Sequence, residues 1–370
     1  MTQADGKPRE SASAILVGLG RGGCAIAAAA KKRCGRDMRV LLADTDARTG
    51  MAHPGEPFLL LGGTRLGGAG SGRDIPNARA AASESMRDFD ERVGNARLAV
   101  VVAGLGGGTG GGAAIEALEH FRRRGTVTFV FATLPFAFEG PEAARLARNA
   151  RPLVEKYSDA CTFQPLDVLV CGAGPDNMRE AFERGMDAAA EGIAFFWRLL
   201  ETPGYISLDL ERIRRTFQDA GPATLLVAGA SGPSRARSAL SAMLDSPLLG
   251  GDGKIPEARK LVVGVLGGDD LRLSETGTVA DGLAAAFGKP EDFSLGTVND
   301  DEAFSGRLVA VAFAFTSAPP APRQTRRRAG KAAADPLGGT SASFGDAKNF
   351  WKGEDLDTPA YLRRNLELER

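Results

Sequence analysis

A glycine-rich loop, residues 18–23 (GLGRGG), follows the first apolar run of the sequence and leads into a helical pattern. Glycines have no Cβ atom, so their backbone amides can approach a phosphate at the N-terminus of the helix. The spacing also matches the G-x-G-x-x-G signature of dinucleotide-binding domains. Asp44 follows Gly23 by 21 residues, where such domains place the acid that binds a ribose. This loop alone therefore fits a nicotinamide-dependent oxidoreductase as well as other nucleotide-binding proteins.

A second and longer glycine run, residues 104–112 (GLGGGTGGG), also lies between an apolar run and a helical pattern. Such a run costs conformational entropy on folding, and a flexible turn would not explain its place between a buried strand and a helix. A third glycine-rich loop, residues 66–72 (LGGAGSG), follows another apolar run. A dinucleotide-binding domain needs only the first loop, whereas three loops at the carboxyl ends of neighbouring strands can enclose a polyphosphate. The three loops together favour a polyphosphate site.

Other side chains that commonly do chemistry are scarce. The chain has two isolated histidines, His53 and His120, so we expect no histidine-centred catalytic or metal site. The four cysteines, at positions 24, 34, 161 and 171, fit neither zinc spacing nor a dense disulfide framework. This pattern predicts reduced thiols and a cytoplasmic protein whose chemistry rests on glycines and carboxylates.

Charge and hydropathy argue against nucleic-acid and membrane roles. The 46 basic residues balance the 46 acidic ones, so no global field draws the protein to nucleic acid or to an anionic membrane. The longest apolar run, residues 127–138, contains Pro135 and is too short to span a bilayer. The first thirteen residues lack the apolar stretch of a signal peptide. The sequence predicts a soluble protein with no nucleic-acid partner and no direct membrane insertion.

Short apolar runs alternate with helical patterns through the first half of the chain, which is typical of buried parallel strands in an α/β protein. We expect strands at residues 14–17, 40–43, 58–61, 98–103, 127–132 and 168–171. We expect helices near residues 22–34, 76–92, 111–124 and 141–156. The pattern predicts a Rossmann-like parallel-sheet domain at residues 13–175.

A long amphipathic segment begins at Asp176, contains no internal proline and stops at Pro203, which predicts a central helix within residues 176–204. A smaller mixed α/β domain is expected at residues 205–316. Its predicted strands are 225–228, 261–265 and 308–315, and its predicted helices are 233–245 and 275–287. From Ser317 the composition shifts to Pro, Ala, Arg, Gly and Ser, which predicts a flexible linker at 317–350 and a terminal docking peptide at 351–370.

The run GGGTGGG at residues 106–112 resembles the phosphate-loop motif of the tubulin and FtsZ family. Residues 45–47 (TDA) resemble the family's Asn-Thr-Asp-Ala stretch, and residues 134–140 (LPFAFEG) its Lys-Pro-Phe-Asn-Phe-Glu-Gly loop. The likeness to FtsZ extends from Ile15 to about Phe315. It implies a tubulin/FtsZ-like α/β fold, with a GTP-binding domain, a central helix, a second domain and a disordered tail. It also implies GTP or GDP as the ligand, with Mg²⁺ accompanying the nucleotide.

The resemblance assigns roles around the nucleotide. Glu139 would bond the ribose, Phe182 would stack on guanine, and Asp187 would accept hydrogen bonds from the guanine N–H groups. The other residues expected to bind the nucleotide are Gly20, Arg21, Gly22, Gly23, Cys24, Ala25, Asp46, Gly70, Gly106, Gly107, Gly108, Thr109, Gly110 and Ala143.

In FtsZ a neighbouring subunit completes the site with a loop that reads Asn-x-Asp-x-x-Asp and orients water against the γ-phosphate. The corresponding stretch here is residues 207–212 (SLDLER). Asp209 matches the first acid, Arg212 replaces the second, and Glu211 is an alternative acid. These three residues are the catalytic candidates of a site shared between subunits. Loss of a water-polarising acid predicts slow hydrolysis, unless Arg212 stabilises the charge of phosphoryl transfer.

The chain also departs from the family pattern at the nucleotide. Arg21 and Ala25 stand where the family has glycine and asparagine, and Ala143 stands where it has an arginine that faces the nucleotide. Arg21 or Arg145 is expected to supply the missing positive charge. Met186 replaces an asparagine of the central helix, which predicts weaker guanine binding.

Residues 357–364 (DTPAYLRR) resemble the terminal peptide with which FtsZ reaches its membrane tethers. Besides self-association, this implies a membrane-tethering division protein of FtsA or SepF type as a partner through residues 355–370. The expected function is GTP-dependent head-to-tail polymerisation into filaments for bacterial-type cell division, in the cytoplasm at the division site. The alternatives left open are a GTP-binding but hydrolysis-poor filament modulator and an NAD(P)-dependent oxidoreductase.

Overall fold

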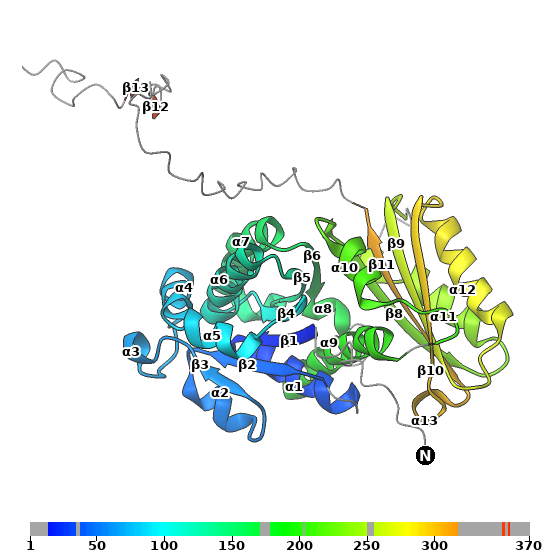
Figure 1. Ribbon diagram of the computed structural model, residues 1–370, viewed down its shortest axis with the longest axis horizontal. Coiled ribbons are helices and arrows are strands. Elements are labelled where there is room, and N and C mark those ends of the chain that lie inside the picture. Colours follow the sequence, from blue (N-terminus) through cyan, green and yellow to red (C-terminus); the bar gives the residue numbers. More distant parts are fainter. Residues whose placement is uncertain are drawn as a thin grey trace, which may run out of the picture. The chain divides into compact units, whose positions relative to one another are not determined.

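The computed structural model describes residues 14–34, 38–170, 178–202, 204–249 and 255–316, and the backbone of two short strands near residue 350. The chain divides into two compact units, Met1–Pro322 and Arg323–Arg370. The first unit holds two sheets with their helices (Figure 1). In the second unit, β12 (Phe350–Trp351) pairs antiparallel with β13 (Glu354–Asp355). The rest of the predicted linker and docking peptide lies outside the described residues.

The larger sheet has seven parallel strands in the order β3-β2-β1-β4-β5-β6-β7. Its central strands are buried along nearly their whole length, as their unbroken apolar runs predict. Leu19 in β1 lies opposite both Ala43 in β2 and Ala103 in β4, so these strands end at one edge. The seven strands are β1 (Ala14–Leu19), β2 (Val40–Asp44), β3 (Phe58–Leu60), β4 (Leu98–Gly104), β5 (Val127–Leu134), β6 (Ala160–Pro165) and β7 (Gly221–Pro222).

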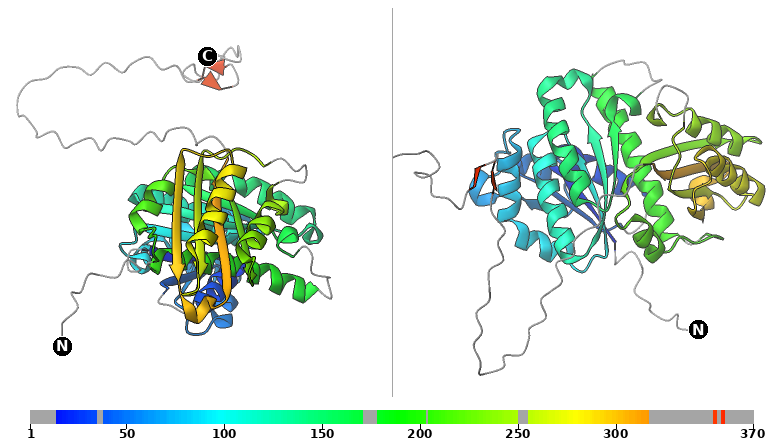
Figure 2. Two further views of the ribbon diagram at one scale, coloured as in Figure 1. Left: turned by 90° about the vertical axis from the view of Figure 1, so that its right-hand side faces the viewer. Right: turned by 90° about the horizontal axis from the view of Figure 1, so that it is seen from above.

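Helices cover both faces of this sheet (Figure 2). The predicted single helix over residues 76–92 is two helices, because Ser85 ends the first and its hydroxyl accepts a hydrogen bond from the Gly62 N–H at 2.9 Å. The helices are α1 (Gly20–Cys34), α2 (Ala47–Ala52), α3 (Gly63–Leu66), α4 (Ile75–Glu84), α5 (Met86–Val93), α6 (Gly108–Arg124), the 3₁₀ turn η2 (Ala137–Glu139), α7 (Gly140–Tyr157) and α8 (Leu166–Leu169).

The strand predicted at residues 168–171 is wrong over residues 168–170, and residue 171 lies outside the described residues. The sixth strand is β6, at Ala160–Pro165, and the residues that follow it form α8. Thr162 and Gln164 interrupt the apolar pattern of β6, yet both side chains are buried. Because these polar residues lie at a seam between domains, β6 has no continuous apolar run to mark it. Pro165 lacks an N–H donor and is the last residue of the strand.

The central helix α9 (Met178–Glu201) packs against α1 and leads to a second, four-stranded sheet in the order β10-β9-β11-β8 (Figure 2). In it β11 is antiparallel to both of its neighbours. Its elements are α10 (Leu210–Phe217), β8 (Thr224–Ser231), α11 (Arg235–Leu244), η3 (Pro247–Leu249), β9 (Lys260–Gly267), α12 (Leu273–Ala286), β10 (Asp292–Asn299), α13 (Asp301–Phe304) and β11 (Arg307–Phe315). None of the described helices is long and apolar enough to cross a bilayer.

An aromatic cluster joins the central helix to both sheets. The ring of Phe129 in β5 lies 5.3 Å from Phe196 in α9, 5.1 Å from Phe217 in α10 and 5.3 Å from Phe313 in β11. All four side chains are fully buried. Each such pair contributes about 0.5–1.5 kcal/mol beyond its buried area. The cluster fixes the second sheet and α10 against the nucleotide domain.

Candidate nucleotide site

A cavity of about 800 Å³ opens where β1, β2, β4 and β5 end, and all three glycine loops contribute to its wall. Parallel strands that end at one edge bring their following loops together, which is where ligands of open α/β sheets bind. The cavity is lined by these residues from the sequence-based prediction: Gly20, Arg21, Gly22, Ala25, Asp46, Gly70, Gly106, Gly107, Gly108, Thr109, Gly110, Glu139 and Phe182.

The glycine loops interlock through their backbones. Gly20 has a φ angle of +70°, and a Cβ atom on it would lie 2.8 Å from the Gly110 nitrogen. A Cβ atom on Gly110 would lie 2.1 Å from the Gly104 oxygen, and one on Gly108 would lie 2.6 Å from Ser71 Oγ. A side chain at any of these positions would push the loops apart. Glycine is therefore required for the loops to pack this closely.

Three hydroxyl groups meet in the cavity wall. The Thr109 hydroxyl lies 2.7 Å from the Thr45 hydroxyl and 3.2 Å from the Ser71 hydroxyl. Beside them Asp44 is 3% exposed and accepts hydrogen bonds from the Thr49 hydroxyl at 2.6 Å and the Thr45 N–H at 2.7 Å. Burial raises the pKa of the Asp44 carboxyl above its ordinary value. Hydroxyl and carboxylate oxygens are the hard ligands that Mg²⁺ takes beside phosphate.

Asp46 holds two arginines at the cavity. Its carboxylate caps α2 by accepting from the Arg48 backbone N–H at 3.0 Å. It also accepts from the guanidinium groups of Arg48 at 2.8 Å and Arg21 at 3.1 Å. Hydrogen bonds from Arg48 are the main reason that the pKa of Asp46 lies well below its usual range. Both arginine side chains are more than 70% exposed, and two cations on one carboxylate leave a net positive charge there.

Aromatic rings and a carboxylate form another part of the wall. Phe182 and Met186 of α9 line the cavity, and the Phe182 ring lies edge-on to Phe136 at 4.9 Å. The Phe136 N–H donates to the Glu139 side chain at 3.0 Å, which fixes that carboxylate beside the cavity. Phe138 stacks on Phe136 at 4.8 Å. A ring and a fixed carboxylate in one wall suit a planar base and a sugar hydroxyl.

Two predicted nucleotide residues lie beneath the first loop instead of in the wall. A Cβ atom on Gly23 would lie 2.3 Å from the Val102 oxygen, so this glycine packs α1 against β4. The buried Cys24 thiol donates to the Gly18 oxygen at 3.3 Å. Burial raises the pKa of this thiol far above its ordinary value, so it stays protonated.

Two others lie outside the wall for different reasons. Ala143 is fully buried behind Gly106, and a Cβ atom on that glycine would lie 3.5 Å from the Ala143 Cβ. Asp187 is exposed on α9 and forms an ion pair with Arg33 of α1 at 2.8 Å. Asp187 therefore has a partner within its own chain in this structure.

The catalytic candidates lie at the start of α10 and do not line the cavity of their own chain. Asp209 is exposed and caps α10 by accepting from the Arg212 backbone N–H at 2.6 Å. Glu211 accepts hydrogen bonds from Arg214 at 3.1 Å and forms an ion pair with Arg97. The hydrogen bond from Arg214 is the main cause that lowers the pKa of Glu211, and the charges of nearby arginines add to it. The Arg212 side chain is exposed and contacts Ser294 only weakly, at 3.4 Å.

Sequence reasoning missed several residues of the wall. Ser71 lies in the third glycine loop, Arg73 directly follows that loop, and both line the cavity. Ser71 carries the one hydroxyl group of residues 66–72, and this hydroxyl could have identified it in the sequence. Thr45 was noted only within the family-like stretch, and Asp44 only as a ribose-binding acid of the dinucleotide alternative. His53, which carried no predicted role, also lines the cavity.

The parallel sheet and its glycine loops define an α/β nucleotide-binding protein. Two family models match successive parts of the chain: the Tubulin/FtsZ family GTPase domain at residues 13–170 and the FtsZ family C-terminal domain at residues 221–314. The chain belongs to the Tubulin/FtsZ family. Membership removes the NAD(P)-dependent oxidoreductase from the alternatives.

Relatives agree with this assignment. The chain is 29% identical over 287 residues to the cell division protein FtsZ of Pseudomonas aeruginosa, covering 77% of this chain and 72% of that protein. An empty FtsZ dimer from M. jannaschii superposes with a TM-score of 0.76 at 22% identity, covering 82% of this chain and 87% of the other. A GTPγS-bound CetZ2 protofilament from Haloferax volcanii gives 0.68 at 22% identity, with 82% and 92% covered. These structures show the tubulin/FtsZ fold.

Proposed function

We propose that the protein binds GTP and GDP in the cavity, assembles head to tail into filaments, and hydrolyses GTP slowly where two subunits meet. The observation that carries this proposal is the separation of the phosphate loops from Asp209 within one chain. The cavity's own carboxylates have other roles: Asp44 is buried beside hydroxyl groups, Asp46 binds two arginines, and Glu139 is assigned to the ribose. A water-orienting carboxylate would then come from another subunit, as Asp209.

The nucleotide would lie with its phosphates on the glycine loops and its base towards α9. Backbone amides of residues 106–110 would bind the phosphates, Glu139 the ribose and Phe182 the guanine ring. Asp187 would accept from the guanine N–H groups after exchanging Arg33 for the base. Arg21 supports phosphate binding because it is exposed, lines the cavity and shares Asp46 with Arg48.

Mg²⁺ fits this arrangement as a companion of the phosphates. It usually keeps several waters and needs only one or two protein ligands beside phosphate oxygens. The hydroxyls of Thr45, Ser71 and Thr109 line the cavity and could provide such ligands. Bound there, Mg²⁺ would neutralise charge on the phosphates. Among the described residues no cluster of three or more His, Cys, Asp or Glu side chains could hold a metal.

Exposed apolar side chains support a head-to-tail contact. Met51 is 78% exposed at the end of α2, next to two residues that line the cavity. Tyr205 is 87% exposed and Ile206 37% exposed in the loop that leads to Asp209. A contact between these different surfaces is heterologous, so it repeats indefinitely into a filament. It would cover both patches and bring Asp209 to the neighbouring nucleotide.

Slow hydrolysis follows from the groups around Asp209. The second family acid is replaced by Arg212, and Glu211 is held by Arg97 and Arg214. An acid held by two arginines is a poor base because its pKa is lowered and its lone pairs are occupied. The replacement of the second acid by Arg212 and the ion pairs of Glu211 also favour the second candidate, a GTP-binding filament component that modulates a more active partner.

We place the filament in bacterial-type cell division, in the cytoplasm at the division site. The name of the Pseudomonas aeruginosa relative, a cell division protein, supports this role. Tethering by an FtsA- or SepF-type protein through residues 355–370 remains a proposal, because all but Asp355 lies outside the described residues.

The experiment that tests the proposal measures phosphate release and light scattering against protein concentration at saturating GTP. A site shared between subunits predicts a specific activity that rises with concentration and an almost inactive monomer. A rate strictly linear in concentration contradicts a shared site. Filaments without measurable phosphate release would instead support the modulator.

A further inference from the structure

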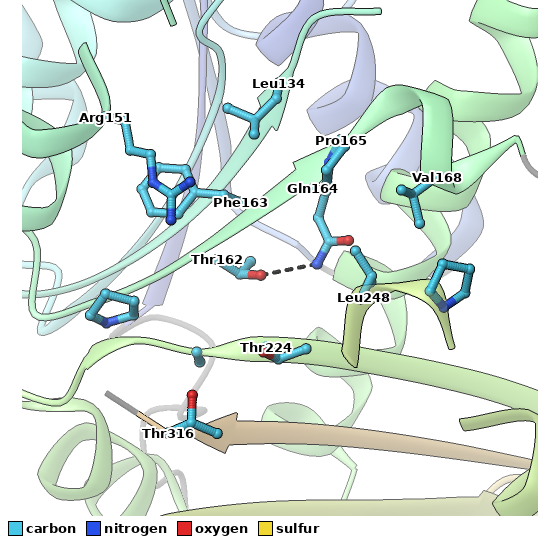
Figure 3. Close-up of a pocket in the computed structure, with 13 residues that line it drawn as sticks. Leu134, Arg151, Thr162, Phe163, Gln164, Pro165, Val168, Thr224, Leu248 and Thr316 are labelled. Carbon is cyan, nitrogen blue, oxygen red and sulfur yellow. Dashed lines mark hydrogen bonds between the residues drawn. The ribbon is translucent and has the colours of Figure 1, made fainter. Parts of the chain in front are cut away.

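A second pocket, of about 370 Å³, lies in the seam between the nucleotide domain and the second domain (Figure 3). The nucleotide domain contributes the end of β5, α7, β6 and α8, and the second domain contributes the starts of β8 and η3 and the residue after β11. The volume equals about a dozen water-sized groups, enough for a small organic molecule. None of the sequence-predicted site residues lines it.

Gln164 gives this pocket an unused hydrogen-bonding group. The residue is 2% exposed, and its side-chain nitrogen donates to Thr162 Oγ1 at 2.9 Å (Figure 3). Its side-chain oxygen Oε1 is buried and has no hydrogen-bond partner among the described residues. Turning the carboxamide around only exchanges which atom is left over. A hydroxyl group both donates and accepts, so an occupant with a hydroxyl satisfies Gln164 in either orientation.

Arg151 gives the pocket a guanidinium group. Its guanidinium carbon lies 4.5 Å from the centre of the Phe163 ring, and its Nε donates to Glu155 at 3.0 Å. The side chain is 49% exposed, and its terminal nitrogens make no hydrogen bond to the described part of the chain. A stacked guanidinium with free N–H groups suits a carboxylate on an aromatic ring. Apolar contacts for such a ring come from Leu134, Pro165, Val168, Pro222, Pro247 and Leu248.

The pocket and the nucleotide cavity share two chain segments. At the end of β5, Leu134 lines the pocket, whereas Thr133 and Pro135 line the nucleotide cavity. Where β6 meets α8, Pro165 lines the pocket and Leu166 lines the cavity. An occupant of either site therefore acts on the same backbone. Any resulting change of affinity must be equal in both directions.

We propose that this interdomain pocket is a second ligand site, for a small aromatic acid that carries a hydroxyl group, and that its occupant changes the affinity for nucleotide. The hydroxyl bonds Gln164, the carboxylate bonds Arg151 and the ring lies on the apolar wall. Because the occupant touches both domains, it stabilises one relative position of the two. The change in nucleotide affinity rests on the proposed function, whereas the site itself does not.

The test uses the full chain, with 4-hydroxyphenylacetate as the probe and calorimetric titration as the measurement. We expect saturable binding that weakens about tenfold in Gln164→Leu and in Arg151→Leu. Arg148→Leu, which changes an exposed arginine on the same helix, is the matched control and leaves binding unchanged. Phenylacetate, which lacks the hydroxyl, binds the wild type about tenfold more weakly but binds Gln164→Leu as well as the hydroxylated probe does.

Three outcomes overturn the site: no saturable binding, an equal loss in Arg148→Leu, or a hydroxyl preference that persists in Gln164→Leu. Arg151 is half exposed, so its variant stays informative if Gln164→Leu unfolds. The coupling is tested by titrating the probe with and without saturating GDP. We expect the probe affinity to change at least threefold, and the GDP affinity to change by the same factor. Independent binding overturns the coupling. If GDP does not bind, the proposed function fails, while the probe titration still decides the pocket.

Discussion

The nucleotide cavity and the start of α10 are built in opposite ways. In the cavity, backbone packs on backbone at Gly20 and Gly110, and the polar side chains bond one another. At the start of α10, Asp209 is exposed, and its hydrogen bond goes to its own helix. The first region can hold a ligand within a single chain. The start of α10 presents exposed polar groups, as a surface that binds another molecule must.

The most severe loss of activity is expected from a change at Asp209. Asp209→Ala should lower GTP hydrolysis at least about a hundredfold, because the water-orienting carboxylate is lost. Its GTP affinity should stay within about twofold of the wild type, since Asp209 does not line the cavity of its own chain. Phosphate release and equilibrium GTP binding measure the two effects.

Asp209→Asn is the matched control, because asparagine is also a favoured helix cap. It should keep the bond to the Arg212 N–H, whereas Asp209→Ala should lose about 1 kcal/mol of unfolding free energy. Both variants should lose hydrolysis. Wild-type turnover in Asp209→Asn, with a defect only in Asp209→Ala, would show that the residue serves only as a cap.

The next effect sharpens the boundary of the cavity, at Asp187. Asp187→Ala should weaken GTP binding by about 1.5–3 kcal/mol, the typical worth of a charge-assisted contact, and should reduce the preference for GTP over ATP. Arg33→Ala is the control, because it breaks the ion pair at 2.8 Å but leaves the carboxylate. It should leave GTP affinity unchanged or higher. Equal losses of GTP affinity in both variants would mean that Asp187 serves only to hold α9 against α1 through the ion pair. Competition titrations with GTP and ATP provide the measurement.

The same contrast explains what sequence reasoning could reach. The glycine loops were predictable because their requirement is local: a glycine run between a buried strand and a helix. The hydroxyl cluster was not, since Thr45 and Thr109 lie 64 residues apart and meet only through the sheet order. Similarly, nothing in the sequence indicates that Arg33 and Asp187 form an ion pair.

Among the elements that the sequence analysis missed, β6 and α10 were missed for a related reason. β6 carries Thr162 and Gln164, which are buried by the second domain, so its pattern depends on a tertiary contact. α10 is short, and its start resembled a catalytic loop. Its apolar side is buried in the core, where Phe217 packs on Phe129 of the aromatic cluster. The resemblance to the FtsZ family identified Asp209 as a catalytic candidate. It could not show that Glu211 forms ion pairs with Arg97 and Arg214.

A smaller effect tests the departure at Arg212. Arg212→Asp should accelerate hydrolysis about tenfold, because it restores a carboxylate near the water, and general-base contributions reach 10²- to 10⁴-fold when geometry is good. The backbone N–H that bonds Asp209 is kept, and an acid in the first turn of a helix is favourable. Arg215→Asp, an exposed site on the same helix, is the control and should not accelerate hydrolysis. A slower Arg212→Asp protein in the phosphate-release assay would instead make Arg212 a catalytic cation.

The smallest effect on the folded unit is expected from removing residues 355–370. The cavity and α10 both belong to the unit Met1–Pro322, whereas the deleted residues belong to Arg323–Arg370. GTP binding and light scattering should therefore match the full chain, while binding to an FtsA- or SepF-type protein should be lost in co-sedimentation. The deletion also removes Asp355 and so half of the β12–β13 pair, which makes a shorter truncation necessary as a control.

Deleting residues 365–370 alone keeps that pair and the peptide at 357–364, and it should keep tether binding. If the longer deletion loses tether binding and the shorter one does not, the peptide or the strand pair carries the contact. Tyr361→Ala then separates these two, because it changes the sequence of the peptide and leaves the residues of both strands unchanged. Loss of polymerisation in the longer deletion would contradict the contrast between the cavity and the start of α10. Assembly would then also need residues 355–370, which lie outside the unit Met1–Pro322 that holds both regions.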